Sequence, residues 1–309
     1  MRLEALTAGI GAGAGPFRGQ VHSVFTRACN ITRAAGGLLA LVVREVGAVP
    51  RGFQLATPPA FSFLDIVRRG QAVACRGGIL RIEGSPLSVE LRPARPWRSA
   101  LPGLALDLGG GNVARAWAVA WSKLVETQGE DVLPRQAAGP IAALLRATRA
   151  LRGKDAATAA AGLIGLGTGL TPAGDDFLIG FLAGLWRTAG CDPARRAFLA
   201  DVGAAIAATT ATNAISRGFL EAAAEGEVSE PLAVLADRLA HGAAPEEVRA
   251  AVRAALAVGA SSGAAGALGL LTGARAWAPI RDPAAGGFSR ALLRLLLVPP
   301  PLDDQADRA

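Results

Sequence analysis

The chain has 309 residues, 51% of them apolar, so it can bury one large hydrophobic core or two smaller ones, and extended disorder is excluded. The net charge is +7, but all except two of the 32 basic residues are arginines, scattered singly or in pairs. The sequence has no basic run and no interleaved row of aromatic residues, which argues against a nucleic acid partner.

The first third of the chain predicts a small β-rich domain. Short segments rich in β-branched residues, mostly bounded by Gly or Pro, predict strands at 21–26, 38–43, 71–75, 79–83 and 87–91. The Pro-rich and then Gly-rich stretch over 92–111 indicates a connector. We therefore expect a β-rich N-terminal domain over 1–108 and an α-helical domain over 109–309.

The remainder is dominated by alanine and leucine, and its Gly and Pro residues are spaced at helix length. Asn112 is expected to cap a helix over 113–127, in which Trp117 and Trp121 share one face and pack in the core. Further helices are predicted at 140–152, 172–189, 193–208, 210–224, 231–241, 245–258 and 261–276, with a weaker one near 288–297. The predicted fold class is α+β, with a small β-rich N-terminal domain and a mainly α-helical C-terminal domain containing buried Gly/Ala-rich helices.

Several features favour a cytoplasmic protein. Residues 254–274 carry no charge, but glycines and serines interrupt the apolar run, so a buried helix hairpin is favoured over a membrane span. No apolar segment follows Met1, so no secretory signal is expected. Cys29, Cys75 and Cys191 are too far apart for a CxxC pair, and each is expected to be a small buried hydrophobic residue.

The segment from Gly165 to Asp176 carries the clearest indication of a functional site. Thr171 is expected to cap a helix with Pro172 in its first turn, which places Asp175 and Asp176 at the mouth of a helix that is apolar all round. Buried carboxylates need backbone donors, an arginine, a metal or a ligand. Adjacent helical positions lie about 100° apart, so one aspartate can bond its own loop while the other faces a pocket. The alternative is simple stabilisation of the helix dipole.

The glycines of this segment do not match either common phosphate-binding loop. No Lys-Ser/Thr pair follows Gly165, Gly167 and Gly169, and no acidic residue stands about 20 positions later on a second strand. A phosphate at this helix start would meet two negative charges, so Mg²⁺ or an arginine would have to accompany it.

Other polar residues are candidate contributors to the same site. Thr209, Asn213, Ser216 and Arg217 fall on one stripe if 210–224 is helical, which is either a solvated face or a site wall with Arg217 as the anion ligand. Ser261 and Ser262 either hold an anion or cap the following helix. The further candidates, each with a structural alternative, are His22, Asn30 and Asn112.

At these residues the sequence resembles the AllH-like family, whose members are subunits of the oxamate carbamoyltransferase of anaerobic allantoin degradation, a part of purine catabolism. The match rests on Gly165–Asp176, with support from residues 21–30, 209–220 and 259–263. The last segment departs from the family pattern, a Gly-His-Ser-Ser-Gly-Thr-Asp run, because Ala260, Ala264 and Ala265 replace its histidine, threonine and acid.

The resemblance implies a subunit that acts with FdrA-like and AllG-like subunits and converts oxalurate and phosphate to oxamate and carbamoyl phosphate, or performs a related transfer. We expect Asp175 and Asp176 to be catalytic, binding Mg²⁺ or the amide N–H groups of a small anionic substrate. The expected substrate-binding residues are Gly167, Gly169, Thr171, Asn213, Ser216, Arg217, Ser261 and Ser262. The alternative is a non-catalytic scaffold or regulatory subunit of a metabolic complex.

Overall fold

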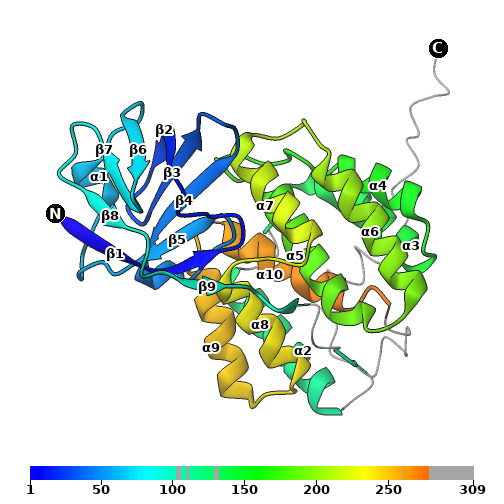
Figure 1. Cartoon of the computed structure of the whole chain (residues 1–309). Coiled ribbons are helices and arrows are strands. Elements are labelled where there is room, and N and C mark those ends of the chain that lie inside the picture. The colour runs from blue at the N-terminus through cyan, green and yellow to red at the C-terminus, as the bar shows by residue number, and fades with distance from the viewer. Residues whose placement is uncertain (102–105, 109–110, 129–131, 260, 278–309) are drawn as a thin grey trace.

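The computed structural model describes residues 1–277 except 102–105, 109–110, 129–131 and 260. Strands occupy the N-terminal part and helices the C-terminal part, and the two pack side by side (Figure 1). The predicted α+β fold class is confirmed. The domain boundary near residue 108 stays a prediction.

The N-terminal part is a closed β-barrel. Its strands are β1 (Arg2–Gly9), β2 (Phe17–Val24), β3 (Ala28–Arg33), β4 (Leu38–Val43), β5 (Gly52–Leu55), β6 (Ala72–Arg76), β7 (Ile79–Ile82), β8 (Ser88–Glu90) and β9 (Arg95–Trp97). They follow the order β5-β4-β3-β2-β6-β7-β8-β1-β9, and an additional pairing of β5 with β1 closes the barrel. Closure satisfies the backbone groups that an open edge would expose.

The five predicted strands correspond to β2, β4, β6, β7 and β8, whereas β1, β3, β5 and β9 were missed. The missed strands contain few β-branched residues, with none in β5 and β9 and only Thr7 in β1, so pairing with neighbours determines their conformation. The short helices η1 (Arg44–Val46) and α1 (Phe63–Ile66) were also missed.

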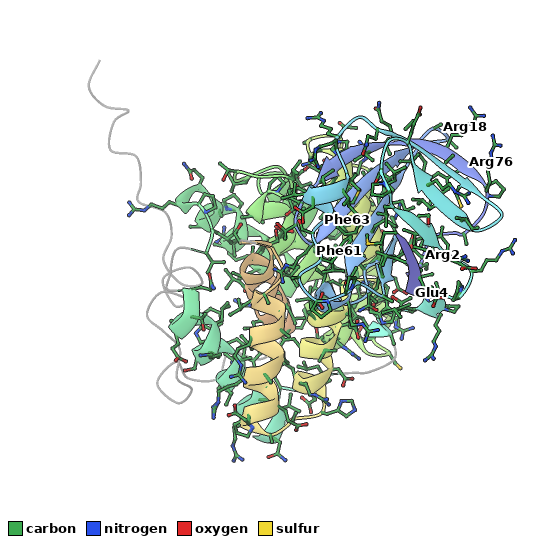
Figure 2. All side chains as sticks on the ribbon, turned by 90° about the vertical axis from the view of Figure 1, so that its left-hand side faces the viewer. Arg2, Glu4, Arg18, Phe61, Phe63 and Arg76 are labelled. Atoms are coloured by element: carbon green, nitrogen blue, oxygen red, sulfur yellow. The ribbon has the colours of Figure 1, made fainter. Side chains whose placement is uncertain are left out.

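Strand β4 joins the barrel to the helices because both of its faces are buried. Leu39 and Leu41 belong to the barrel core, while Ala40 and Val42 form a separate apolar cluster against Phe219 of the helical part. The continuous apolar run of this strand is typical of a strand covered on both sides. Elsewhere the barrel is solvated, and Figure 2 shows Arg18 and Arg76 together on its outer surface.

The C-terminal part consists of α2 (Gly111–Gln128), η3 (Arg135–Ala137), α3 (Ala138–Arg149), α4 (Gly153–Ala161), α5 (Ala173–Ala189), α6 (Pro193–Ala207), α7 (Ala214–Ala224), α8 (Glu230–Ala240), α9 (Pro245–Leu256) and α10 (Ser262–Ala274). The helix predicted over 140–152 ends earlier, at Arg149, because the chain turns at Leu151 with a φ of 53°. The helix α4 that follows this turn was not predicted. Asn112 is the second residue of α2 and not its cap. The weak helix near 288–297 lies outside the described residues.

Helices α5 and α10 form the centre of the helical part, with backbones almost in contact (Figure 1). A Cβ on Gly180 would lie 1.9 Å from the carbonyl oxygen of Gly266, and one on Gly269 would lie 2.0 Å from that of Phe177. Trp117 donates from Nε1 to the Leu271 carbonyl at 2.9 Å and stacks on Trp121 at 5.5 Å, so both tryptophans are core residues as predicted. Within the described part of the chain, no helix is long and apolar enough to cross a membrane.

Polar contacts tie the barrel to the helices. The Ala48 N–H donates to Glu230 at 2.7 Å, Arg51 pairs with Glu221 at 2.9 Å, and Arg27 donates to the Ala257 carbonyl at 2.7 Å. These contacts fix the position of β2–β5 over α7, α8 and α9.

The three cysteines do not behave alike. Cys29 and Cys75 are buried in the barrel, as predicted, but Cys191 is exposed after the end of α5, so the prediction of three buried cysteines was wrong for this residue. Its position one residue after Gly190 is a surface turn.

Candidate functional site

The glycines of the Gly165–Asp176 segment allow the loop before α5 to fold back on the helix. Gly165, Gly167 and Gly169 have φ values of 75°, 113° and 104°, in the region that disfavours side chains. A Cβ on Gly167 would also lie 2.9 Å from the Ala173 nitrogen. The helix start is therefore wrapped by its own loop.

The predicted capping role of Thr171 is wrong. The cap position of α5 is Pro172, and no side chain caps the helix. The Thr171 hydroxyl instead lies 2.6 Å from the Ser262 hydroxyl at the start of α10. The loop and α10 are thereby joined next to the two aspartates, a contact between residues 91 positions apart that local sequence patterns do not encode.

Asp175 bonds its own surroundings. Its Oδ1 accepts from the Gly165 N–H at 2.7 Å and its Oδ2 accepts from the Thr212 hydroxyl, and the residue is completely buried. Asp175 therefore links the glycine loop to the segment before α7. Both of its carboxylate oxygens have donors from the protein.

Asp176 has a different environment. It is only 7% exposed, and its Oδ2 is buried without a hydrogen-bond partner. Burial raises the pKa of this carboxyl to about 7; the Ser262 and Thr171 hydroxyls oppose the rise, and the charge of Asp175 adds to it. Near neutral pH the group therefore exists both as an acid that donates and as a carboxylate that accepts.

Asp176 lines a cavity of about 590 Å³ between the barrel and the helices, here called the interdomain cavity. The barrel contributes the β2–β3 turn, β3, β4 and the loop before β5. The helical part contributes residues 168–171 of the glycine loop and residues from α5, α7, α8, α9 and α10. Of the predicted site residues, the cavity brings together Gly169, Thr171, Asp176, Ser261, Ser262 and Asn30.

The predicted polar stripe on α7 does not exist, because α7 begins at Ala214 and Thr209 lies before it. Asn213 caps α7 by accepting from the Ile215 and Ser216 N–H groups, and it donates to the Leu170 carbonyl at 2.8 Å. It therefore supports the glycine loop without lining the cavity.

Ser216 and Arg217 also lie outside the cavity lining. The Ser216 hydroxyl is buried without a partner, and Arg217 is 3.9 Å from Glu221, which pairs with Arg51. The Arg217 guanidinium, which was expected to bind an anion, therefore lies at the edge of the contact between the barrel and the helices. Gly167 shapes the loop from outside the cavity.

His22 and Asn30 are linked through one hydroxyl in the barrel. Asn30 donates from Nδ2 to Ser23 Oγ at 3.0 Å, and His22 Nδ1 lies 3.3 Å from the same oxygen. His22 lines a second cavity of about 450 Å³, here called the His22 cavity. Asn112 packs against Gly242 and lines neither cavity.

Sequence reasoning missed several lining residues. Glu227 is buried and accepts from Ser99 N–H at 2.9 Å and Arg98 Nε at 3.0 Å, so it joins the segment after β9 to the segment before α8. Phe25, Arg27 and Phe219 also line the cavity. None of them has a local pattern that distinguishes it from a core or surface residue.

Within the described ranges, no group of three or more His, Cys, Asp and Glu side chains is placed to hold a metal ion. The carboxylate oxygens of Asp175 are both taken by protein donors. Of the two aspartates, only Asp176 therefore has a carboxylate oxygen without a protein donor that could bind a cation.

Two family models match the chain on both sides of the interdomain cavity. The model described as oxamate carbamoyltransferase subunit AllH matches residues 163–274, and the AllH family N-terminal domain matches residues 5–96. The first range contains the glycine loop, both aspartates and Ser262, and the second contains the strands that form the opposite wall. No curated protein and no solved structure matches the chain.

Proposed function

We propose, from the premise that this chain belongs to the AllH family, that it is the carbamoyltransferase subunit that binds the amide substrate, and that it does so in the interdomain cavity. The observation that carries this proposal is Asp176, a buried carboxyl with one unpartnered oxygen and a pKa raised to about 7, at the wall of that cavity. A group of this pKa suits proton transfer at neutral pH.

The transfer requires one proton to move. When the carbamoyl group passes from a ureido substrate such as oxalurate to phosphate, the bond between its carbon and the departing nitrogen breaks, and a bond from that carbon to a phosphate oxygen forms. The departing nitrogen must gain a proton, and hydrogen phosphate must lose one. In this proposal Asp176 gives its proton to the nitrogen and regains one from solvent, while the phosphate releases its proton to solvent, so atoms and charge balance.

The neighbouring residues position this group. Asp175 holds the glycine loop through Gly165 and the segment before α7 through Thr212. The hydrogen-bonded Thr171 and Ser262 hydroxyls lie beside Asp176, where they orient the carboxyl and offer polar contacts to an amide head group. Asp175 is thus a positioning residue in this proposal.

The geometry does not fit the expected Mg²⁺ ion. Mg²⁺ keeps several waters and needs oxygen ligands in octahedral geometry. Asp175 has no oxygen without a donor, and apolar side chains form most of the surrounding wall. The proposed proton transfer therefore uses Asp176 alone and requires no metal.

The family name describes a subunit, and we propose that the partners are FdrA-like and AllG-like chains. The test is a reconstituted complex with these partners, assayed for carbamoyl phosphate formation with Asp176→Asn and, as a matched control, the exposed Asp201→Asn. Loss of a general acid–base group is expected to lower kcat by about 10²–10⁴-fold. Asp201→Asn should keep the parental rate.

The same assay separates catalysis from a scaffold role. If the Asp176→Asn complex assembles normally by gel filtration and keeps the parental kcat, the chain is a scaffold or regulatory subunit. Thermal melting with and without Mg²⁺ adds a direct check on the metal: no stabilisation by Mg²⁺ alone is expected.

A further inference from the structure

The interdomain cavity is large for a small polar substrate. Its volume of about 590 Å³ lies in the range of sites that enclose drug-sized ligands, ~300–1,000 Å³. A molecule as small as oxalurate would leave much of that space to water, and apolar walls do not hold water well.

The walls are apolar on both sides. Val42 and Val46 line the cavity from the barrel, and Ile179, Phe219 and Leu232 line it from the helices. Such surfaces favour a ligand that itself removes apolar area from water.

The charged side chains of the lining are Asp176, Glu227 and Arg27. Glu227 accepts from Arg98 and Ser99, and Arg27 donates to the Ala257 carbonyl. Among the described lining residues, an anionic head group would therefore meet two acidic side chains and no cation without a protein partner. An uncharged head group that donates N–H bonds suits Asp176 better.

The apolar surface continues out of the cavity. Val24, Phe25, Leu64 and Leu170 line both the interdomain cavity and the His22 cavity. Phe25, Leu64 and Leu170 are 40%, 49% and 37% exposed, which is unusual for large apolar side chains that lie together. They offer a contact surface to a ligand that extends beyond the Asp176 end.

We infer, resting on the proposed function, that the substrate is a carboxamide or ureido compound whose uncharged head group binds at Asp176 and whose apolar substituent of several carbons extends toward Phe25 and Leu64. The head group supplies N–H donors to the Asp176 carboxyl, which lines the cavity and has one oxygen without a protein partner. The substituent displaces water from the apolar wall, and each methylene group that becomes buried strengthens binding roughly fourfold.

The experiment titrates the full chain by calorimetry with a series from methylurea to hexylurea. We expect Kd to fall roughly fourfold for each added methylene until the apolar wall is covered. Leu64→Ser removes part of that wall at an exposed position and should flatten the dependence on chain length while leaving methylurea binding unchanged. Val234→Ser is the matched control, because Val234 is 39% exposed on α8 and lines neither cavity.

A second variant tests the head group. Asp176→Leu should weaken every member of the series by a similar factor, because all of them share the ureido group. Melting curves of each variant establish that it is folded before the titration.

The outcomes separate the inference from the proposed function. Asp176-dependent binding that does not strengthen with chain length would overturn the apolar substituent and leave the proposed function standing. Binding that strengthens with chain length but is unchanged in Asp176→Leu would overturn the head-group assignment. If no urea binds, and oxamate and carbamoyl phosphate also fail to bind, the proposed function fails together with the inference.

Discussion

Asp176 illustrates how one position along a helix changes the chemistry of a carboxyl group. Asp175 and Asp176 are neighbours in the first turn of α5, yet Asp175 accepts two protein hydrogen bonds, whereas Asp176 has a buried oxygen without a partner. Their separation of about 100° around the helix directs one to the loop and the other to the cavity. Burial without matching donors favours the protonated form.

This environment predicts a dependence of stability on pH. In the unfolded chain the carboxyl loses its proton near the ordinary pKa of 3.8, whereas folded Asp176 holds it to about pH 7. Between these values the folded state binds more protons, so the free energy of unfolding falls as pH rises, by at most about 4 kcal/mol. In Asp176→Asn the free energy of unfolding should not fall in this way. The variant should therefore be more stable than the parent at pH 8 and differ little from it at pH 4.

Urea unfolding at both pH values measures the effect, with the exposed Asp201→Asn as the control. An Asp176→Asn variant that is less stable than the parent by the same amount at pH 4 and pH 8 would contradict a pKa raised by burial. It would indicate a carboxylate held charged by donors.

Asp175 leads to the opposite expectation for stability. Asp175→Ala leaves the Gly165 N–H and the Thr212 hydroxyl without their acceptor, and a buried donor left unsatisfied costs about 1–3 kcal/mol. Thr212→Val removes only one of the two bonds and should cost less. Urea unfolding at a single pH gives both values, and equal losses in the two variants would show that the Gly165 bond contributes nothing.

At the scale of elements, α5 and α10 depend on glycine for their close approach. Gly180 faces the Gly266 carbonyl, while Gly269 and Gly273 face carbonyls of α5. Close packing keeps the start of α5 beside the start of α10, where Thr171 meets Ser262. The helix pair thus positions the polar end of the cavity.

Gly180→Ala is expected to destabilise the protein by about 1–3 kcal/mol or more, because its Cβ would lie 1.9 Å from a backbone oxygen and the helices would have to separate. Gly266→Ala is a matched control on the facing helix. Its Cβ would have no neighbour closer than 3.7 Å, so the better helix propensity of alanine should raise stability by up to about 1 kcal/mol. Thermal unfolding of both variants measures this, and equal destabilisation would disprove the packing argument.

At the scale of the whole molecule, the candidate site is formed only where the barrel meets the helices. Phe219 of α7 packs on Ala40 and Val42 of β4, and Glu230 bonds the Ala48 N–H. Neither part alone encloses the cavity. The barrel is therefore both a wall of the site and a cover for apolar helix surface.

We expect a fragment over 109–309 to lack cooperative unfolding, because removing the barrel exposes Ile215 and Phe219 and leaves Glu227 and Glu230 without their donors. Urea unfolding and near-ultraviolet circular dichroism test this. Glu221→Gln in the full chain is the control, since its ion pair with Arg51 is about one-third exposed and should contribute less than about 1 kcal/mol. A soluble fragment with a single cooperative transition would refute the dependence on the barrel.

Local patterns were sufficient where one segment determines its own structure. The apolar run of β4, the Pro starts of α6 and α9 and the all-apolar face of α5 are visible in the sequence, because periodicity and capping act over a few residues. The same local chemistry identified the Gly165–Asp176 segment. Short strands such as β5 and β9 escaped, since only their neighbours in the barrel make them strands.

The division of the site between Asp175 and Asp176 was foreseeable as an alternation around a helix, but their partners were not. Thr212 bonds Asp175 across 37 residues of chain, and Ser262 comes beside Asp176 through its contact with Thr171 across 91 residues. Burial, and hence the raised pKa of Asp176, is a property of the enclosing barrel and helices together. The sequence by itself determined the fold class and the helix start at which Asp175 and Asp176 lie. The tertiary structure alone decided which polar residues share a cavity, because distance through space and exclusion of water depend on packing between distant segments.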